Sequence, residues 1–113
     1  MTDDQAAAAQ DTAYTEVEGA LLADADDDVT SGPGGLSVRG DLFAVRSPDG
    51  DLVVDLPEAR ARDLVERGAA EAFDDVPVAA KGAWVLVREL DTWVELATEA
   101  HQFVGEPSVG RDS

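Results

Sequence analysis

Hydrophobic and polar residues are most clearly patterned between residues 36 and 54. Apolar residues dominate the segments 36–38, 42–45 and 52–54, which are separated by Arg39-Gly40-Asp41 and by Ser47-Pro48-Asp49-Gly50. The second separator has Pro, Asp and Gly at the second, third and fourth positions, which is typical of a type I turn followed by a bulge. The pattern therefore predicts three short antiparallel strands in a meander.

Apolar residues recur at helical spacing in three other segments, which predicts helices over Ala13–Ala23, over Leu56–Arg67 and from Leu90 or Asp91 to Val104. The residues expected on their buried faces are Tyr14, Val17 and Leu21; Ala61, Leu64 and Val65; and Trp93, Leu96, Ala97, Ala100 and Val104.

The helix ends carry recognisable signals. Thr15 with Glu18 has the spacing of a capping box for the first helix, and the acid run 24–28 opposes its continuation. For the second helix, Asp55 or Leu56 is expected at the cap, with Pro57 in the first turn and Gly68 as the stop.

The remaining segments complete the predicted order. Thr30–Gly35 is expected to be a loop, Glu71–Phe73 a short edge strand, Asp74–Gly82 a loop, and Trp84–Val87 a central strand. The order is α-βββ-α-β(β)-α. This predicts an α+β fold in which an antiparallel β-meander sheet has its helices packed on one face.

Composition bounds the domain organisation. The 113 residues suffice for one hydrophobic core. We expect a disordered acidic tail over residues 1–11, a single domain over 12–105 and a C-terminal tail over 106–113. No apolar run approaches the roughly 20 residues of a membrane span, and the start of the chain lacks a secretory pattern, so we expect a cytoplasmic protein.

The charge is strongly acidic, with 25 acids against 8 bases and a net charge of −17. Two explanations compete: adaptation of the whole chain to molar salt, where screening is nearly complete, or a solvated acidic tail on an ordinary domain. Lys81 is the only lysine in the chain, which favours the high-salt explanation. Either way, a polyanion is a poor partner for nucleic acid phosphates.

A series of short motifs, in a particular order, suggests a family. They are Gly34-Gly35-Leu36, Val38-Arg39-Gly40, Leu42-Phe43-Ala44, Asp49-Gly50, Leu52-Val53-Val54, the helix from Pro57 to Gly68, Phe73, Lys81-Gly82, Trp84-Val85 and Trp93-Val94-Glu95-Leu96-Ala97. Together they resemble the TfoX N-terminal domain and the related YjbR family over roughly residues 29–107. The chain departs from the family pattern at Gly32 and Pro33, where a Met-Phe pair is common, at Asp41, where a base is common, and at the inserted Ala83.

The resemblance implies an α+β fold similar to secretion-chaperone-like domains. TfoX-type proteins regulate competence genes and carry a second, C-terminal domain, for which this length leaves no room, so we do not expect that role here. YjbR-like proteins are often described as DNA-binding.

The candidate chemical groups are few. His101, at the edge of the last helix's apolar face, is more simply a structural boundary residue than a general base, because no serine or cysteine lies near it in sequence. Asp24, Asp26 and Asp28 have calcium-loop spacing, but Val29 and Gly35 occupy positions where an EF-hand needs Gly and Glu. Only weak, non-specific cation binding is expected there.

The middle helix carries Arg60, Arg62 and Arg67 among acids, and Asp63 with Arg67 has i,i+4 spacing, so we expect a self-neutralised surface. Trp84 and Trp93 lie in apolar patterns and are expected in the core.

We therefore expect a small non-enzymatic domain, without catalytic, metal-binding or cofactor-binding residues, that acts through a protein partner or self-association at an exposed sheet face or edge. The candidate interaction residues are Arg39, Arg46, Lys81 and Arg88. Two alternatives stay open: a nucleic-acid-associated transcriptional or competence-type regulator, and a small enzyme that uses acidic residues with His101.

Overall fold

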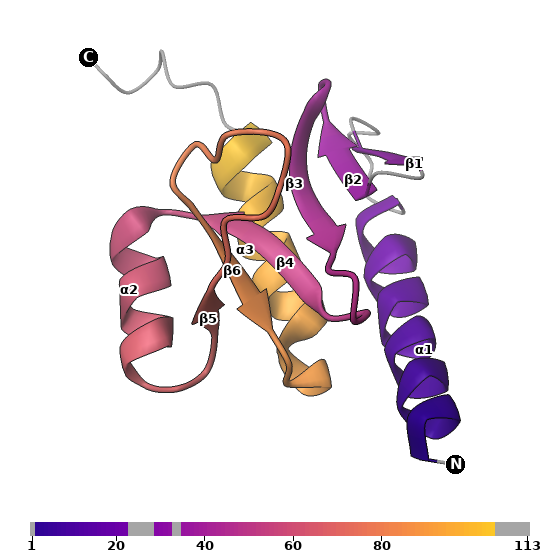
Figure 1. The fold of residues 1–113 in the computed structure, drawn as a ribbon. Helices are drawn as coiled ribbons and strands as arrows, with labels where there is room; N and C mark the ends of the chain where they lie inside the picture. Colours follow the sequence, from indigo (N-terminus) through magenta and orange to yellow (C-terminus); the bar gives the residue numbers. More distant parts are fainter. Residues whose placement is uncertain (1, 23–28, 33–34, 106–113) are drawn as a thin grey trace, which may run out of the picture.

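The computed structural model describes residues 2–22, 29–32 and 35–105, and the side chains from residue 7 onward within them. It is an α+β fold, as predicted, with a six-stranded antiparallel sheet in the order β1-β2-β3-β4-β6-β5 (Figure 1). The elements are α1 (Thr2–Leu22), β1 (Val29–Gly32), β2 (Gly35–Val38), β3 (Asp41–Arg46), β4 (Leu52–Leu56), α2 (Glu58–Glu66), β5 (Glu71–Ala72), β6 (Ala83–Val87), the 3-10 turn η1 (Leu90–Thr92) and α3 (Trp93–Gly105).

Both turns of the predicted meander are confirmed. Arg39 and Gly40 join β2 to β3 with φ angles of 55° and 88°, the positive pair of a two-residue hairpin turn. Between β3 and β4, the Gly50 amide donates to the Ser47 carbonyl at 2.8 Å, and the Ser47 amide donates to the Asp51 carbonyl at 2.8 Å. Gly50 has a φ of 92°, as a type I turn with a bulge requires.

The sheet has one more strand at its start than the pattern predicts. β1 pairs with β2 from Val29↔Val38 to Gly32↔Gly35, so the expected Thr30–Gly35 loop is in part a strand. Backbone pairing with β2 holds this edge strand although its Thr, Ser and Gly residues are exposed. Its composition therefore gave no strand signal.

A bulge in β3 lets two consecutive residues face the same core. Leu36 pairs with Ala44 and Ser37 with Leu42, so Phe43 is the extra residue. As a result Phe43 and Ala44 are both fully buried in the larger core cluster.

The second half of the chain follows the prediction with two corrections. β4 extends to Leu56, so Asp55 and Leu56 are strand residues rather than helix caps, and Pro57 occupies the cap position of α2. Gly68, with a φ of 77°, follows the end of this helix as expected. β6 lies between β4 and β5 inside the sheet, which confirms a central strand.

The expected disorder of residues 1–11 is wrong, because α1 begins at Thr2. Its alanine run has high helix propensity, and Gln10 Nε2 ties it to the sheet by donating to Asp51 Oδ1 at 3.0 Å. The predicted Thr15–Glu18 capping box is also wrong, since Thr15 Oγ1 donates to the Asp11 carbonyl within the helix. The predicted end of this helix and the 24–28 acid run lie outside the described residues.

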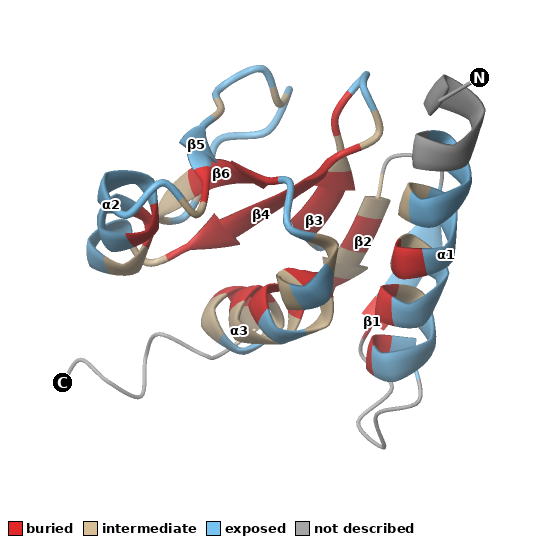
Figure 2. Cartoon of the chain, turned by 90° about the horizontal axis from the view of Figure 1, so that it is seen from below, coloured by how far each residue is buried: buried red, intermediate tan, exposed pale blue. Residues whose placement is uncertain are grey.

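The helices cover one face of the sheet, as predicted. α3 lies across this face, α1 packs beside it, and α2 covers the β5–β6 end (Figure 2). The predicted buried face of α3 is confirmed, because Trp93, Leu96, Ala97, Ala100 and Val104 all join the larger core cluster. On α1, Val17 and Leu21 are buried in this cluster as predicted, whereas Tyr14 is only half-buried against it. None of the helices within the described ranges combines the length and hydropathy that a membrane span requires.

No helix of the described ranges lies on the opposite face of the sheet. The buried hydrophobic residues of this face are Val45, Val53, Trp84 and Leu86, and they form a second, smaller cluster. The loop 73–82 lies over them, with Phe73, Val76 and Ala80 packed against the cluster. We call this surface the loop-covered face and the other the helix-covered face.

Candidate functional site

The four predicted interaction residues fall at two opposite ends of the sheet. Arg46 ends β3 beside the 47–50 turn, and Arg88 reaches the same end by facing Asp51. Arg39 is in the β2–β3 turn at the other end, and Lys81 faces Asp41 next to that turn. The structure therefore brings them together as two pairs and not as one basic surface.

Arg46 fastens α1 to the sheet. Its Nη1 lies 3.0 Å from Asp11 Oδ1, and its Nε and Nη2 donate to the Gly50 carbonyl at 3.1 and 2.8 Å. The guanidinium also stacks 5.2 Å from the centre of the Tyr14 ring. Burial raises the pKa of Tyr14, and so does the nearby Glu18 carboxylate, whereas Arg46 opposes the rise.

Arg88 and Lys81 face carboxylates as well. Arg88 Nε lies 3.7 Å from Asp51 Oδ2, and its Nη1 pairs with Glu71. The hydrogen bond to Glu71 is the main reason why the pKa of Arg88 is raised. Lys81 Nζ lies 3.6 Å from Asp41 Oδ2. A phosphate would have to displace these carboxylates, an arrangement that does not favour nucleic acid binding.

Two of the three arginines predicted on the middle helix, Arg60 and Arg67, are also paired. Arg67 Nη2 lies 3.0 Å from Asp63 Oδ2, which confirms the i,i+4 pair. Arg60 holds Glu99 of α3 with two bonds of 2.9 Å each, and this hydrogen bonding raises the pKa of Arg60. The contact with Glu99 links helices 39 positions apart, so no local spacing indicated it.

His101 sits at the core boundary, as expected for a structural residue. Its ring is half-buried and meets Phe43 edge-on, with the ring centres 5.5 Å apart. The described part of the chain contains no group of three or more histidine, cysteine or acidic side chains arranged to hold a metal ion. Asp24, Asp26 and Asp28 lie outside it.

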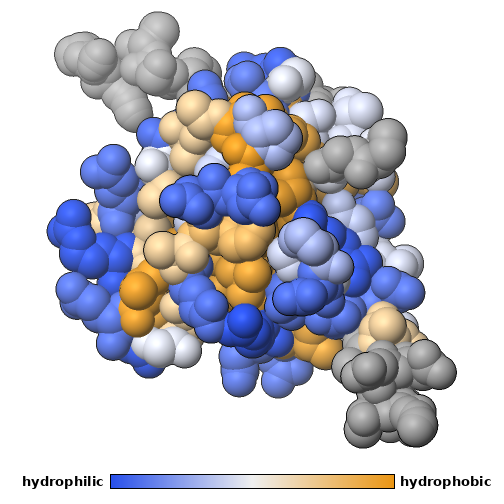
Figure 3. Space-filling model, viewed as in Figure 1, coloured by the Kyte–Doolittle hydropathy of each residue, from blue (hydrophilic) through white to orange (hydrophobic). Residues whose placement is uncertain are grey.

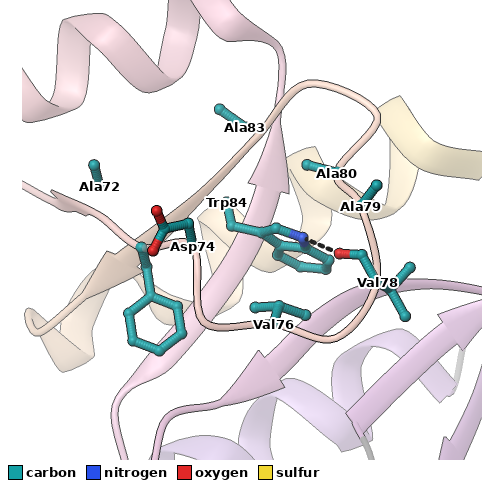
Figure 4. Close-up of a pocket in the computed structure, with 9 residues that line it drawn as sticks. Ala72, Asp74, Val76, Val78, Ala79, Ala80, Ala83 and Trp84 are labelled. Carbon is teal, nitrogen blue, oxygen red and sulfur yellow. Dashed lines mark hydrogen bonds between the residues drawn. The ribbon is translucent and has the colours of Figure 1, made fainter.

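The most distinctive surface is the loop-covered face. Seen from this side, apolar residues run down the centre of the molecule between hydrophilic margins (Figure 3). A hollow of about 430 Å³ opens here under the loop. It is lined by Ala72, Phe73, Asp74, Val76, Val78, Ala79, Ala80, Ala83 and Trp84 (Figure 4).

Three sets of hydrogen bonds hold the loop in place over the sheet. The Phe73 amide donates to the Trp84 carbonyl at 3.1 Å, and Trp84 Nε1 donates to the Val78 carbonyl at 2.8 Å. At the far end, the amides of Lys81 and Gly82 donate to the two carboxylate oxygens of Asp55 at 2.7 and 2.9 Å. The hollow is therefore bounded by a fixed loop.

Asp55 is the residue that sequence reasoning missed. It is 1% exposed, and its carboxylate binds the loop instead of capping α2. Gly82 is required at the same contact, because a Cβ there would meet the Leu56 carbonyl oxygen at 2.1 Å. A lone acid within an apolar strand was the available signal, since such a residue needs buried hydrogen-bond partners.

A second hollow of about 490 Å³ lies between α2 and β5–β6. It shares Ala72, Ala83 and Trp84 with the first, so the two hollows adjoin at the edge of the sheet. Val65 lines it and is 38% exposed, although helical spacing placed this residue on the buried face of α2. The burial of Trp84 and Trp93 is confirmed, at 6% and 0% exposure.

No model of a known protein family matches the chain, and no curated protein or solved structure matches it either. The TfoX/YjbR resemblance stays a prediction.

Proposed function

We propose that this protein is a small non-enzymatic TfoX/YjbR-like domain that acts through protein–protein contact, and that the loop-covered face is its contact surface. The observation that carries the proposal is the apolar hollow beside Trp84, continued by a second hollow at the sheet edge. Val78 and Val65, one at each hollow, are two of the three large apolar side chains exposed in the described ranges. Exposed apolar surface of this kind marks interaction sites.

The bonds that fix the loop support the proposal. A partner that meets a preformed surface does not have to order it, which lowers the entropic cost of association. Asp55 supplies two of these bonds from inside the sheet, where it is shielded from water. The site is thus built by the fold itself and ready to receive an apolar side chain.

We further propose that the chain works at high salt. The net charge of −17 and the single lysine support this, because a dense carboxylate surface repels itself less as the Debye length falls to about 3 Å at 1 M salt. A far-UV circular dichroism series from low to molar KCl tests it. The signal should gain helix and strand content with salt, and a signal unchanged by salt would contradict the adaptation.

The contact proposal is tested by affinity capture from an extract of the source cells. Val78→Asp places a charge on the hollow, whereas Leu22→Asp changes a residue of similar exposure, 41% against 43%, on α1. We expect a partner that is lost with Val78→Asp and kept with Leu22→Asp. Capture that is equal for both variants, or absent with the wild-type chain, would overturn the proposal.

A further inference from the structure

We infer that the partner segment is a basic amphipathic helix, whose apolar face fills the two hollows and whose cations meet the acids beside them. This inference rests on the proposed function and names the chemistry of the partner. Small residues at the junction, Ala72 and Ala83, leave room on both sides of the Trp84 ring. Trp84 lines both hollows as well, so a single segment that passes over Ala72, Ala83 and the Trp84 ring can reach both of them.

The two hollows present apolar walls of different origin. In the first, Val76, Val78 and Trp84 come from the loop and β6, and Figure 4 shows the Trp84 ring facing the interior beneath the loop. In the second, Ala61 and Val65 come from α2. Apolar side chains on one face of a helix would find a pocket on either side of the residues that the two hollows share.

The charges around the hollows are mainly negative. Asp74 lines the first, and Glu58 and Glu66 line the second, where Arg62 is the one base. All four side chains belong to exposed residues. Three carboxylates and one guanidinium select a partner that carries Lys or Arg beside its apolar residues.

Other occupants fit this surface less well. A strand added to the sheet beside the hollows would have to pair with β5, which is two residues long and whose Glu71 is engaged by Arg88. A second copy of the chain would bring the same acidic margin to the interface, so Glu58, Glu66 and Asp74 would face further carboxylates in place of cations. A helix that binds through its side chains needs no free strand edge, and a basic helix brings no further carboxylates.

The test uses three synthetic helical peptides of about 15 residues, a length at which an isolated helix is marginally stable in water. The first has leucines on one face and arginines on the other. The second has the same composition with that segregation scrambled, and the third has Glu in place of Arg. Binding is followed by calorimetry and by tryptophan emission, since Trp84 lines the hollow and Trp93 is fully buried.

Two double variants of the full chain provide the comparison. Asp74→Asn/Glu66→Gln removes two carboxylates at the hollows, and Glu16→Gln/Asp91→Asn removes two exposed carboxylates on α1 and η1. We expect the segregated basic peptide to bind and to change the Trp84 emission. The first double variant should weaken binding about tenfold, and the second should leave it nearly unchanged.

Three results with the peptides would overturn the inference. In the first, the segregated basic peptide does not bind. In the second, the scrambled peptide binds as tightly as the segregated one and both double variants have equal effects. In the third, the acidic peptide binds more tightly than the basic peptide. Concentration-dependent dimerisation that Val78→Asp abolishes would also overturn it, because the occupant would then be a second copy. The contact proposal fails separately, when capture of the cellular partner does not depend on Val78.

Discussion

A tryptophan packs against each face of the sheet and donates its indole N–H to a backbone carbonyl, but the surroundings of the two rings differ. On the helix-covered face, Trp93 is 0% exposed and its Nε1 donates to the Val87 carbonyl at 3.0 Å. On the loop-covered face, Trp84 is 6% exposed and donates to the Val78 carbonyl at 2.8 Å. Trp93 lies in a closed core, whereas Trp84 also lines a hollow.

The difference suggests a division of labour between the faces. The larger cluster draws on all three helices and five of the strands, so most of the apolar burial that stabilises the fold lies on that side. The smaller cluster is closed by a loop that polar bonds hold in place. A surface that contributes less to stability is free to present apolar groups to a partner.

The sharpest test of this division compares Trp93→Ala with Trp84→Ala. Truncation of a fully buried aromatic residue costs about 3–5 kcal/mol, so Trp93→Ala should greatly lower the free energy of unfolding or prevent folding. Trp84→Ala should cost less, because the ring already borders open space. Urea unfolding followed by circular dichroism measures both, and equal losses would remove the distinction between the faces.

A smaller effect is expected from Asp55→Ala, which leaves the amides of Lys81 and Gly82 without their acceptors. We expect a loss of about 1–3 kcal/mol in the free energy of unfolding. Hydrogen exchange at these two loop amides should become faster than in the wild-type chain, with a smaller change at the amides of the sheet. Asp91→Asn, at an exposed residue of η1, serves as the control and should change neither quantity. Unchanged exchange in Asp55→Ala would show that the carboxylate does not hold the loop.

Two glycine replacements should have opposite signs. Gly82→Ala places a Cβ 2.1 Å from the Leu56 carbonyl oxygen, so we expect a loss of about 1–3 kcal/mol. Gly19→Ala meets nothing within 4 Å on α1, and it should gain about 0.5–1 kcal/mol because alanine favours the helix. Thermal or urea unfolding measures both. A stabilising Gly82→Ala would contradict the close contact between β4 and the end of the loop.

The smallest effect is the pH dependence contributed by Tyr14. Because burial raises its pKa in the folded chain above the ordinary value of 10.0, the folded state holds this proton more tightly. The stability from this group is fully present below pH 10 and falls as the pH rises through the raised pKa. Tyr14→Phe should flatten the unfolding free energy in that alkaline range. A decline identical to that of the wild-type chain would assign the effect to other groups.

Strong local punctuation made the meander and the last helix predictable. The turns at residues 39–40 and 47–50 depend on Gly and Pro at defined positions, and the buried face of α3 follows helical spacing. β1 was missed because an exposed edge strand is held by backbone pairing with its neighbour, so its side chains need not follow an apolar pattern. The early start of α1 was missed because its first half is held in part by distant residues. Gln10 bonds to Asp51, which is 41 positions away, and Asp11 bonds to Arg46, which is 35 positions away.

The candidate site was less predictable for the same reason. Val78, Ala83 and Trp84 were visible as apolar residues, but the hollow arises only where the loop, β5 and β6 meet. The role of Asp55 depends on two amides 26 and 27 positions away. The basic residues were chosen from the sequence for their positive charge, but the acidic side chains that face them could be identified only from the three-dimensional structure.

The central claim is that the loop-covered face receives the partner. It is tested most directly by placing the photo-crosslinker p-benzoylphenylalanine at residue 78 in one chain and at residue 22 in another, in extract of the source cells. We predict one discrete adduct from residue 78, competed by excess wild-type chain and not by Val78→Asp, and none from residue 22. An adduct formed only from residue 22, or one from residue 78 that Val78→Asp competes fully, would contradict the account.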